Sequence, residues 1–210
     1  MKSQCLEIVR QKCQSCKGCA LAKTRNNVVF SDGNPSTARI VLIGEAPGEI
    51  EDEMGMPFVG RAGQLLDEFL AEAGISRQDD LYMINTVKCR PPENRVPTEE
   101  EKSACRKFLE AQIDIIKPEA IVLCGATALK SFVELDKKQT ISKVRGKWMS
   151  VTVDGVKYKA MTIFHPSYLL RNHSMEEGSP RRLMQQDLAE IKNTVLGDRV
   201  FNEEKELVLA

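Results

Sequence analysis

Four cysteines in two spaced pairs are the residues of this chain whose types and spacing most directly indicate chemistry. Cys16 and Cys19 form a C-x-x-C turn, and Cys89 and Cys105 flank a proline-containing loop far downstream. A C-x-x-C turn directs two thiolates at one ion or cluster, and two further cysteines complete a set of four sulfur ligands. The pattern predicts a metal centre that joins the N-terminal segment to the middle of the chain.

Other uses of the cysteines stay open at this point. Zinc accepts four thiolates, but zinc ribbons usually pair two C-x-x-C turns, and a redox C-x-x-C needs a thioredoxin-like context that is missing here. Cys13 extends the run to C-x-x-C-x-x-C, as in bacterial ferredoxins, yet no Cys-Pro follows close by. The spacing favours an iron–sulfur cluster over zinc. We expect Cys5 and Cys124 to be buried free thiols.

Composition sets the class of protein that must position these residues. The chain has 210 residues, no net charge, 42% apolar residues and only 5% aromatic residues, which predicts a single domain, 1–210, with an aliphatic core. No apolar run is long enough to cross a bilayer, and the first residues lack a secretory apolar stretch. Seven cysteines without such a stretch favour a reducing compartment, so we expect a cytoplasmic protein. The charged residues 197–210 are expected to form a flexible tail.

Apolar runs alternate with helical patterns along the chain. Continuous runs at 38–43, 81–87 and 120–124, and one ending near 164, predict buried strands, with a hairpin at 148–160 leading into the last. Helical periodicity with capping residues predicts helices at about 65–73, 98–116, 126–133 and 180–195. The order indicates a three-layer α/β/α sandwich around a central, mostly parallel four-stranded sheet.

Polar and glycine-rich residues follow each predicted strand. The segments are GEAPG at 44–48, NTVKCR at 85–90, CGATAL at 124–129 and HPSYLLRN at 165–172. Because ligands bind outside the carboxyl ends of strands in such sheets, we expect these segments to converge on one binding site.

Four residues near these strand ends have side chains suited to a site. Glu45 lies in a tight loop, and Phe58 offers an aromatic face on which a base can stack, unless it only packs under the next helix. Asn85 has paired donor and acceptor atoms, and can instead cap a turn. His165 is a candidate acid or hydrogen-bond donor, although a lone histidine before proline is often a turn residue.

Charged residues gather in several short stretches. We expect most of the acidic run Glu49, Glu51, Asp52 and Glu53 to be solvated. Three basic clusters fit a rim that contacts phosphates: Lys88, Arg90 and Arg95; Lys143, Arg145 and Lys147; Arg171, Arg181 and Arg182.

Together these segments resemble family 4 uracil-DNA glycosylases, the iron–sulfur branch of the uracil-DNA glycosylase superfamily. The resemblance rests on GEAPGEIEDEMGMPFVGRAGQLLDEFL, INTVKCRPPENRVP, KVRGKW, FHPSYLLRN and the order of the four cysteines, and it runs from Cys16 to about Val195. It implies a structural [4Fe-4S] cluster. It also favours Cys16 and Cys19 over Cys13 as ligands, because those two keep the family's distance to VVF at 28–30.

The resemblance also implies roles for the site residues. A uracil within a duplex must be flipped into a pocket. There Phe58 resembles the aromatic that stacks on it, Asn85 the amide that pairs with its polar edge, and His165 the donor to O2 as negative charge develops. The pocket loop that holds the attacking water corresponds to Gly44, Glu45, Ala46 and Pro47. The loop that enters the minor groove corresponds to Ser167, Leu169, Leu170 and Arg171, with either leucine as the wedge.

The water-activating base is not fixed by the resemblance. The best-known branch of the superfamily has an aspartate where this chain has Ala46. Glu45 is our first candidate, with Glu51 and Asn94 in support, and Glu51 can alternatively crowd the C5 position and reject thymine. A dissociative path through an oxocarbenium-like state demands little from a base.

The sequence thus predicts a DNA-repair hydrolase that removes uracil from single- or double-stranded DNA and leaves an abasic site. One alternative is a protein that binds and traps uracil-DNA. The trapping relatives carry a His-containing insertion after the third cysteine, whereas residues 90–104 contain no histidine. The other alternative is a metal-stapled interaction module of a replication complex, which would not need a convergent polar rim. We expect a monomer, and an interaction with a sliding clamp is not readable from the sequence.

Overall fold

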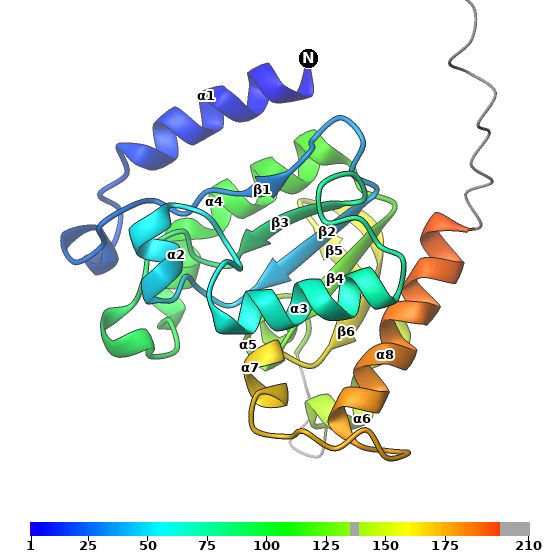
Figure 1. Cartoon of the computed structure of the whole chain (residues 1–210). Helices are drawn as coiled ribbons and strands as arrows, with labels where there is room; N and C mark the ends of the chain where they lie inside the picture. The colour runs from blue at the N-terminus through cyan, green and yellow to red at the C-terminus, as the bar shows by residue number, and fades with distance from the viewer. Residues whose placement is uncertain (135–138, 198–210) are drawn as a thin grey trace, which may run out of the picture.

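Six strands form one sheet in the order β1-β3-β2-β4-β6-β5 in the computed structural model of the chain (Figure 1). Residues 1–134 and 139–197 are described, so the predicted tail lies outside them beyond Gly197. The strands are β1 Asp32–Gly33, β2 Ile40–Gly44, β3 Leu81–Asn85, β4 Ala120–Cys124, β5 Trp148–Val153 and β6 Val156–Ile163.

The sheet is parallel at its centre and antiparallel at both edges. Strands β3, β2, β4 and β6 run parallel, which confirms the predicted central strands. The predicted number of four strands is wrong, because β5 pairs with β6 across the hairpin and the two-residue β1 pairs with β3. The mostly parallel α/β architecture itself is confirmed.

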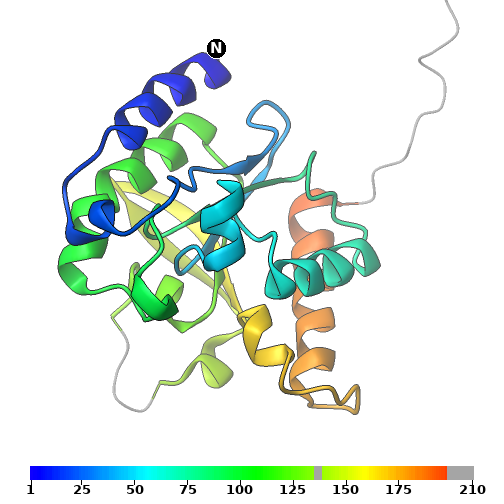
Figure 2. The same cartoon turned by 60° about the vertical axis from the view of Figure 1, so that its left-hand side comes forward.

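Two apolar layers cover the sheet, as period-two alternation along the strands requires. In β2, Ile40 and Leu42 pack on the side of α3 (Arg61–Glu72) and α8 (Pro180–Ile191), whereas Val41 and Ile43 pack on the side of α4 (Glu99–Ile116). Figure 2 shows the two helical layers on opposite sides of the sheet. Every residue of β2, β3 and β4 is buried, so only the strand ends are available for a ligand.

Local sequence signals account for the starts of α4 and α8. Thr98 and Glu101 form the predicted capping box of α4, and Ser179 caps α8 ahead of Pro180. The predicted helix at 126–133 is shorter in the structure, where α5 ends at Lys130. The helices are α1 Lys2–Gln14, α2 Glu49–Met54, α3 Arg61–Glu72, α4 Glu99–Ile116, α5 Ala126–Lys130, α6 Ile141–Val144, α7 Pro166–Leu169 and α8 Pro180–Ile191, with shorter helical turns at Ala20–Lys23, Pro92–Asn94 and Lys192–Leu196.

Helix α1 is an element that the periodicity did not reveal. It lies along α4, where Leu6 and Cys13 are buried in the same apolar cluster as Phe108 (Figure 1). The Lys2 ammonium also donates to the carbonyl of Ile116, 2.7 Å away. This packing brings the chain that follows α1 to the end of α4 that carries Cys105.

Candidate active site and cysteine cavity

A cleft of about 450 Å³ opens at the carboxyl ends of the parallel strands. Strands β2 and β3 end side by side, with Gly44 in register with Asn85. The predicted rim residues therefore come together at one edge of the sheet. The cleft is lined by Glu45, Ala46, Pro47, Gly48, Glu51, Phe58, Ala62, Gly63, Asn85, Pro91, Asn94, Arg95, His165, Ser167 and Arg171.

Gly44, Phe58 and Asn85 pack closely together at the cleft. A Cβ added to Gly44 would lie 2.4 Å from Asn85 Oδ1 and 2.5 Å from Phe58 Cζ, so only glycine allows both side chains to come so close. Asn85 and Phe58 are 3% and 6% exposed. The Asn85 amide and the Phe58 ring therefore form a fixed pair on the floor of the cleft.

Glu45 is oriented by two threonines. The Thr127 hydroxyl donates to Glu45 Oε2, and the Thr86 hydroxyl donates to the Glu45 carbonyl oxygen. Thr127 belongs to α5 and holds the Glu45 carboxylate, whereas Thr86, which follows β3, holds the Glu45 backbone. The threonines give the carboxylate a defined position from which it can accept a proton or orient a water molecule.

His165 is held with a defined tautomer at the start of α7. Its Nδ1 accepts the Ser167 backbone N–H at 3.2 Å, which places the ring proton on Nε2 in the neutral imidazole. A Cβ on Gly125 would come within 2.9 Å of the His165 Cβ, so this glycine makes room for the histidine. Burial lowers the pKa of His165, against the opposing charges of Glu45 and Glu51. The geometry therefore provides a neutral N–H donor at this edge of the cleft.

The acidic run at 49–53 is less solvated than expected. Asp52 is 1% exposed and accepts the backbone N–H groups of Asn26 and Asn27. Glu51 is half-buried, and its Oε1 accepts the N–H groups of Val59 at 3.1 Å and Gly60 at 2.8 Å. Both carboxylates therefore fix loops rather than stand free in solvent. Glu51 in particular holds the turn that carries Phe58.

The two candidate wedge leucines lie in different environments. Leu169 is fully buried in the core cluster beneath α7. The structure thus gives no support to Leu169 as a side chain that enters a groove, because it is already packed against the protein. Leu170 is half-buried at the edge of the same cluster, and Ser167 and Arg171 are exposed along the cleft. Tyr168, which we had not singled out, is 46% exposed next to them.

Two of the three basic clusters are not simple surface patches. Lys88 is fully buried, where its ammonium donates to the Asn85 carbonyl at 2.8 Å. Arg95 pairs with Glu101, and Arg145 pairs with the buried Asp187. The expected phosphate rim is therefore wrong for Lys88 and Arg145, whose charges are used inside the protein.

The four predicted ligand cysteines line one cavity together with Cys13. The segment after α1 supplies the first cysteines, the segment after β3 supplies Cys89, and α4 supplies Cys105. The Arg25 guanidinium donates to Cys89 Sγ at 3.0 Å, and the Gly18 N–H donates to Cys16 Sγ at 3.4 Å. Such donors favour thiolate sulfur, as a metal centre requires. Cys13 is 2% exposed, so the ambiguity that it raised in the sequence persists in the fold.

The other two cysteines behave differently from each other. Cys5 is exposed, so the expectation of a buried thiol there is wrong; it lies on the outer face of α1. Cys124 is buried at the end of β4, and burial raises its pKa. Burial likewise raises the pKa of Cys105 to about 11 and that of Cys13 to about 12.

The chemistry of the donor set in this cavity fits a metal centre with sulfur ligands. Four cysteines from three segments line it. An iron–sulfur cluster is held by four such thiolates, each bound to iron. A single zinc ion also accepts four thiolates.

The fold and the cleft define a class of α/β/α protein with an open cleft at the carboxyl edge of a parallel sheet. The sequence profile of the uracil DNA glycosylase superfamily matches residues 30–189. The type-4 uracil-DNA glycosylase of Thermotoga maritima is 50% identical over 197 residues, covering 92% of this chain and 96% of that protein. The type-4 enzyme of Archaeoglobus fulgidus is 44% identical over 173 residues, covering 81% and 85%. The chain therefore belongs to the uracil-DNA glycosylase superfamily and, within it, to the type-4 family.

The chain is also similar to an enzyme of a second glycosylase type. The type-5 uracil-DNA glycosylase of Thermus thermophilus is 36% identical over 115 residues, covering 48% of this chain and 52% of that protein. No helix in the described part of the chain is long and apolar enough to span a membrane.

Proposed function

We propose that this protein hydrolyses the N-glycosidic bond of uracil in DNA, releasing free uracil and leaving an abasic site. The observation that carries the proposal is the packing of Phe58 and Asn85 over Gly44 at the floor of the cleft. An aromatic ring beside a fixed amide offers a planar base one stacking face and one polar edge. The names of the type-4 relatives support the same assignment.

Recognition requires the uracil to leave the DNA stack and enter the cleft. There the base stacks on Phe58, and Asn85 donates from its NH2 group to O4 and accepts from N3–H. Cytosine presents a donor in place of O4 and an acceptor in place of N3–H, so the same amide orientation disfavours it. Leu170, half-buried next to the cleft residue Arg171, is the side chain that we assign to fill the vacated stack, and Arg171 is the one that we assign to contact a phosphate.

Bond cleavage places negative charge on the leaving uracil. The His165 Nε2–H is the donor that we assign to O2, because Nδ1 already accepts from Ser167. Removing one preorganised donor to a developing oxyanion typically slows a reaction about 100- to 1,000-fold. Glu45, oriented by Thr127, is the group that we assign to hold the water and stabilise the positive charge developing on the sugar.

We propose that Cys16, Cys19, Cys89 and Cys105 hold a structural [4Fe-4S] cluster. Bound there, it would join the N-terminal segment, the loop after β3 and helix α4. Lys88 lines the same cavity and donates to the Asn85 carbonyl, so the cysteine cavity lies close to the strand end that carries Asn85. We expect the protein to act as a monomer in a reducing, cytoplasmic environment.

The proposal is tested with matched oligonucleotides that contain uracil or thymine at one position. Free uracil is measured directly, and abasic sites are revealed by alkaline cleavage. We expect release from the uracil strand only, and a loss of orders of magnitude in Asn85→Asp, because its carboxylate would face O4 with an acceptor. A protein that traps the sugar covalently would release at most one uracil per protein molecule and would stay attached to the strand. A protein that only binds the DNA, or an interaction module, would release no uracil.

A further inference from the structure

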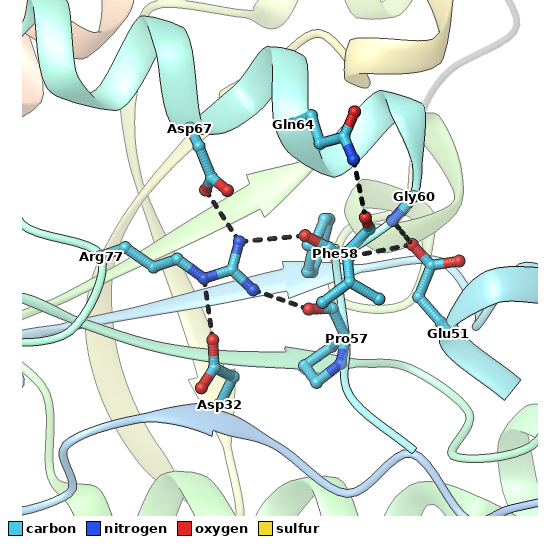
Figure 3. Close-up of polar contacts among 9 residues, drawn as sticks. Asp32, Glu51, Pro57, Phe58, Gly60, Gln64, Asp67 and Arg77 are labelled. Carbon is cyan, nitrogen blue, oxygen red and sulfur yellow. Dashed lines mark hydrogen bonds and ion pairs between the residues drawn. The ribbon is translucent and has the colours of Figure 1, made fainter. Parts of the chain in front are cut away.

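The turn that carries Phe58 is held by side chains from distant elements (Figure 3). Arg77, between α3 and β3, donates from Nη2 to the Pro57 carbonyl at 2.7 Å and from Nη1 to the Phe58 carbonyl at 3.0 Å. On the other side of the turn, Glu51 accepts the N–H groups of the next two residues. The Arg77 guanidinium thus binds two consecutive carbonyl groups of the turn, and the Glu51 carboxylate binds the two N–H groups that follow them.

Arg77 is itself anchored on both sides. Its Nε donates to Asp32 of β1 at 2.8 Å, and its Nη1 donates to Asp67 of α3 at 2.7 Å. Four of the five N–H groups of the guanidinium are therefore used, in two ion pairs and two backbone contacts. Its side chain is only 16% exposed. The planar fork fixes the turn against β1 and α3 at once, which the point charge of a lysine cannot do.

The turn needs this support because Phe58 has a strained backbone. Its φ is +56°, in the left-handed region that costs a non-glycine residue about 1–3 kcal/mol. Such a conformation persists only where the surroundings determine it. The same φ directs the ring over Gly44 and against Asn85. A turn released from Arg77 can relax and move the ring away from the amide.

We propose that Arg77 is a positioning residue for base recognition: it holds Phe58 in the orientation that stacks on the flipped base. Arg77 does not line the cleft and acts only through the Pro57–Phe58 carbonyls. The inference rests on the proposed function for its link to uracil, but its structural part stands by itself. Neither the cysteine pattern nor the strand-end rule points to this residue.

A double-mutant cycle tests whether Arg77 acts through Phe58. Arg77→Met should lower single-turnover uracil excision by roughly 10- to 100-fold, the range expected for a lost or misplaced stacking contact. In a Phe58→Ala background the same change should alter the rate by no more than about twofold, because no ring remains to be positioned. An equal loss in both backgrounds, or no loss in the native background, overturns the proposal.

The control is Arg39→Met, which removes another arginine that binds an acid through two N–H groups. Arg39 bonds Glu119 at the opposite end of β2 from the cleft, with donor–acceptor distances of 2.6 and 2.8 Å. We expect its loss to affect thermal stability and leave the rate of excision near the native value. A comparable rate loss in Arg39→Met would mean that general destabilisation explains the Arg77 result.

A second measurement does not depend on activity. Protein labelled with fluorophenylalanine at its seven phenylalanines gives ¹⁹F resonances, and a Phe58→Leu sample assigns the one from Phe58. We expect that resonance to shift or broaden in Arg77→Met and to stay unchanged in Arg39→Met. An unchanged Phe58 resonance in Arg77→Met overturns the positioning role. If the native protein excises no uracil, the proposed function fails, and the spectrum still decides whether Arg77 holds Phe58.

Discussion

Replacing Gly44 with alanine is the sharpest test of the cleft floor. The new Cβ would lie 2.4 Å from Asn85 Oδ1 and 2.5 Å from Phe58 Cζ, whereas ordinary contacts begin near 3.4 Å. The amide and the ring must therefore separate by about 1 Å, a displacement that can cost about 100-fold in rate when reacting groups lose alignment. Phe58 cannot simply retreat, because Arg77 and Glu51 hold its turn. We expect single-turnover excision to fall by about that factor.

The control for this prediction separates position from stability. Overpacking at Gly44 is expected to cost about 1–3 kcal/mol of unfolding free energy. Gly155→Ala, in the β5–β6 turn, meets no atom within 4 Å but has φ +78°, so alanine there costs about 1–2 kcal/mol through backbone strain. Both variants should have a lower melting temperature than the native protein, and only Gly44→Ala should lose uracil excision. Native excision by a folded Gly44→Ala protein would refute the arrangement of amide and ring described here.

Three further predictions address the cysteine cavity and the two groups assigned to the chemical step. Cys105→Ser should lower the iron content and the visible thiolate-to-iron absorption. Cys5→Ser, on the exposed face of α1, should leave both unchanged. Equal iron content in the two variants would contradict the ligand assignment. The pKa of His165 is lowered from 6.5 in the folded state, so the unfolded chain binds the proton more tightly. The native protein should therefore lose stability relative to His165→Gln as the pH falls below about 6.5. Melting temperatures of the two proteins that change in parallel between pH 7.5 and 5.5 would contradict this. Glu45→Gln keeps the shape of the side chain and its contact with Thr127 but removes the negative charge. The rate of uracil excision should therefore fall strongly, while the affinity for uracil-DNA changes little. A native single-turnover rate would assign the water molecule to another group.

The central fold was predictable because the buried strands are continuous apolar runs. Strand β4 has the predicted bounds. Strand β3 ends two residues earlier than predicted, and β2 begins two residues later and ends one residue later than predicted. The number of strands was not predictable in the same way. Strand β1 has only two residues and exists because β3 offers it a free edge. Helix α1 was missed because its apolar residues are few, and packing on α4 stabilises it rather than its own periodicity.

The site was predictable to the extent that strand ends meet at one edge of a parallel sheet. This rule brought Glu45, Asn85 and His165 together without any structure. The rule did not show whether Leu169 or Leu170 is the wedge, because the helical turn α7 determines which of the two faces the core. It placed Thr127 in one of the converging segments but gave this residue no role, and it did not point to Arg77. Their roles depend on partners that are distant in sequence, and an isolated threonine or arginine carries no local signal for such a contact.

Direct detection of free uracil tests the central claim most simply. Purified protein with its full iron content is incubated with an oligonucleotide that carries one uracil and with its thymine counterpart, and the released base is identified by mass. The proposed function predicts stoichiometric free uracil and an alkali-labile strand from the first oligonucleotide, and neither from the second. Iron-loaded protein that binds the uracil strand and releases no base would contradict it.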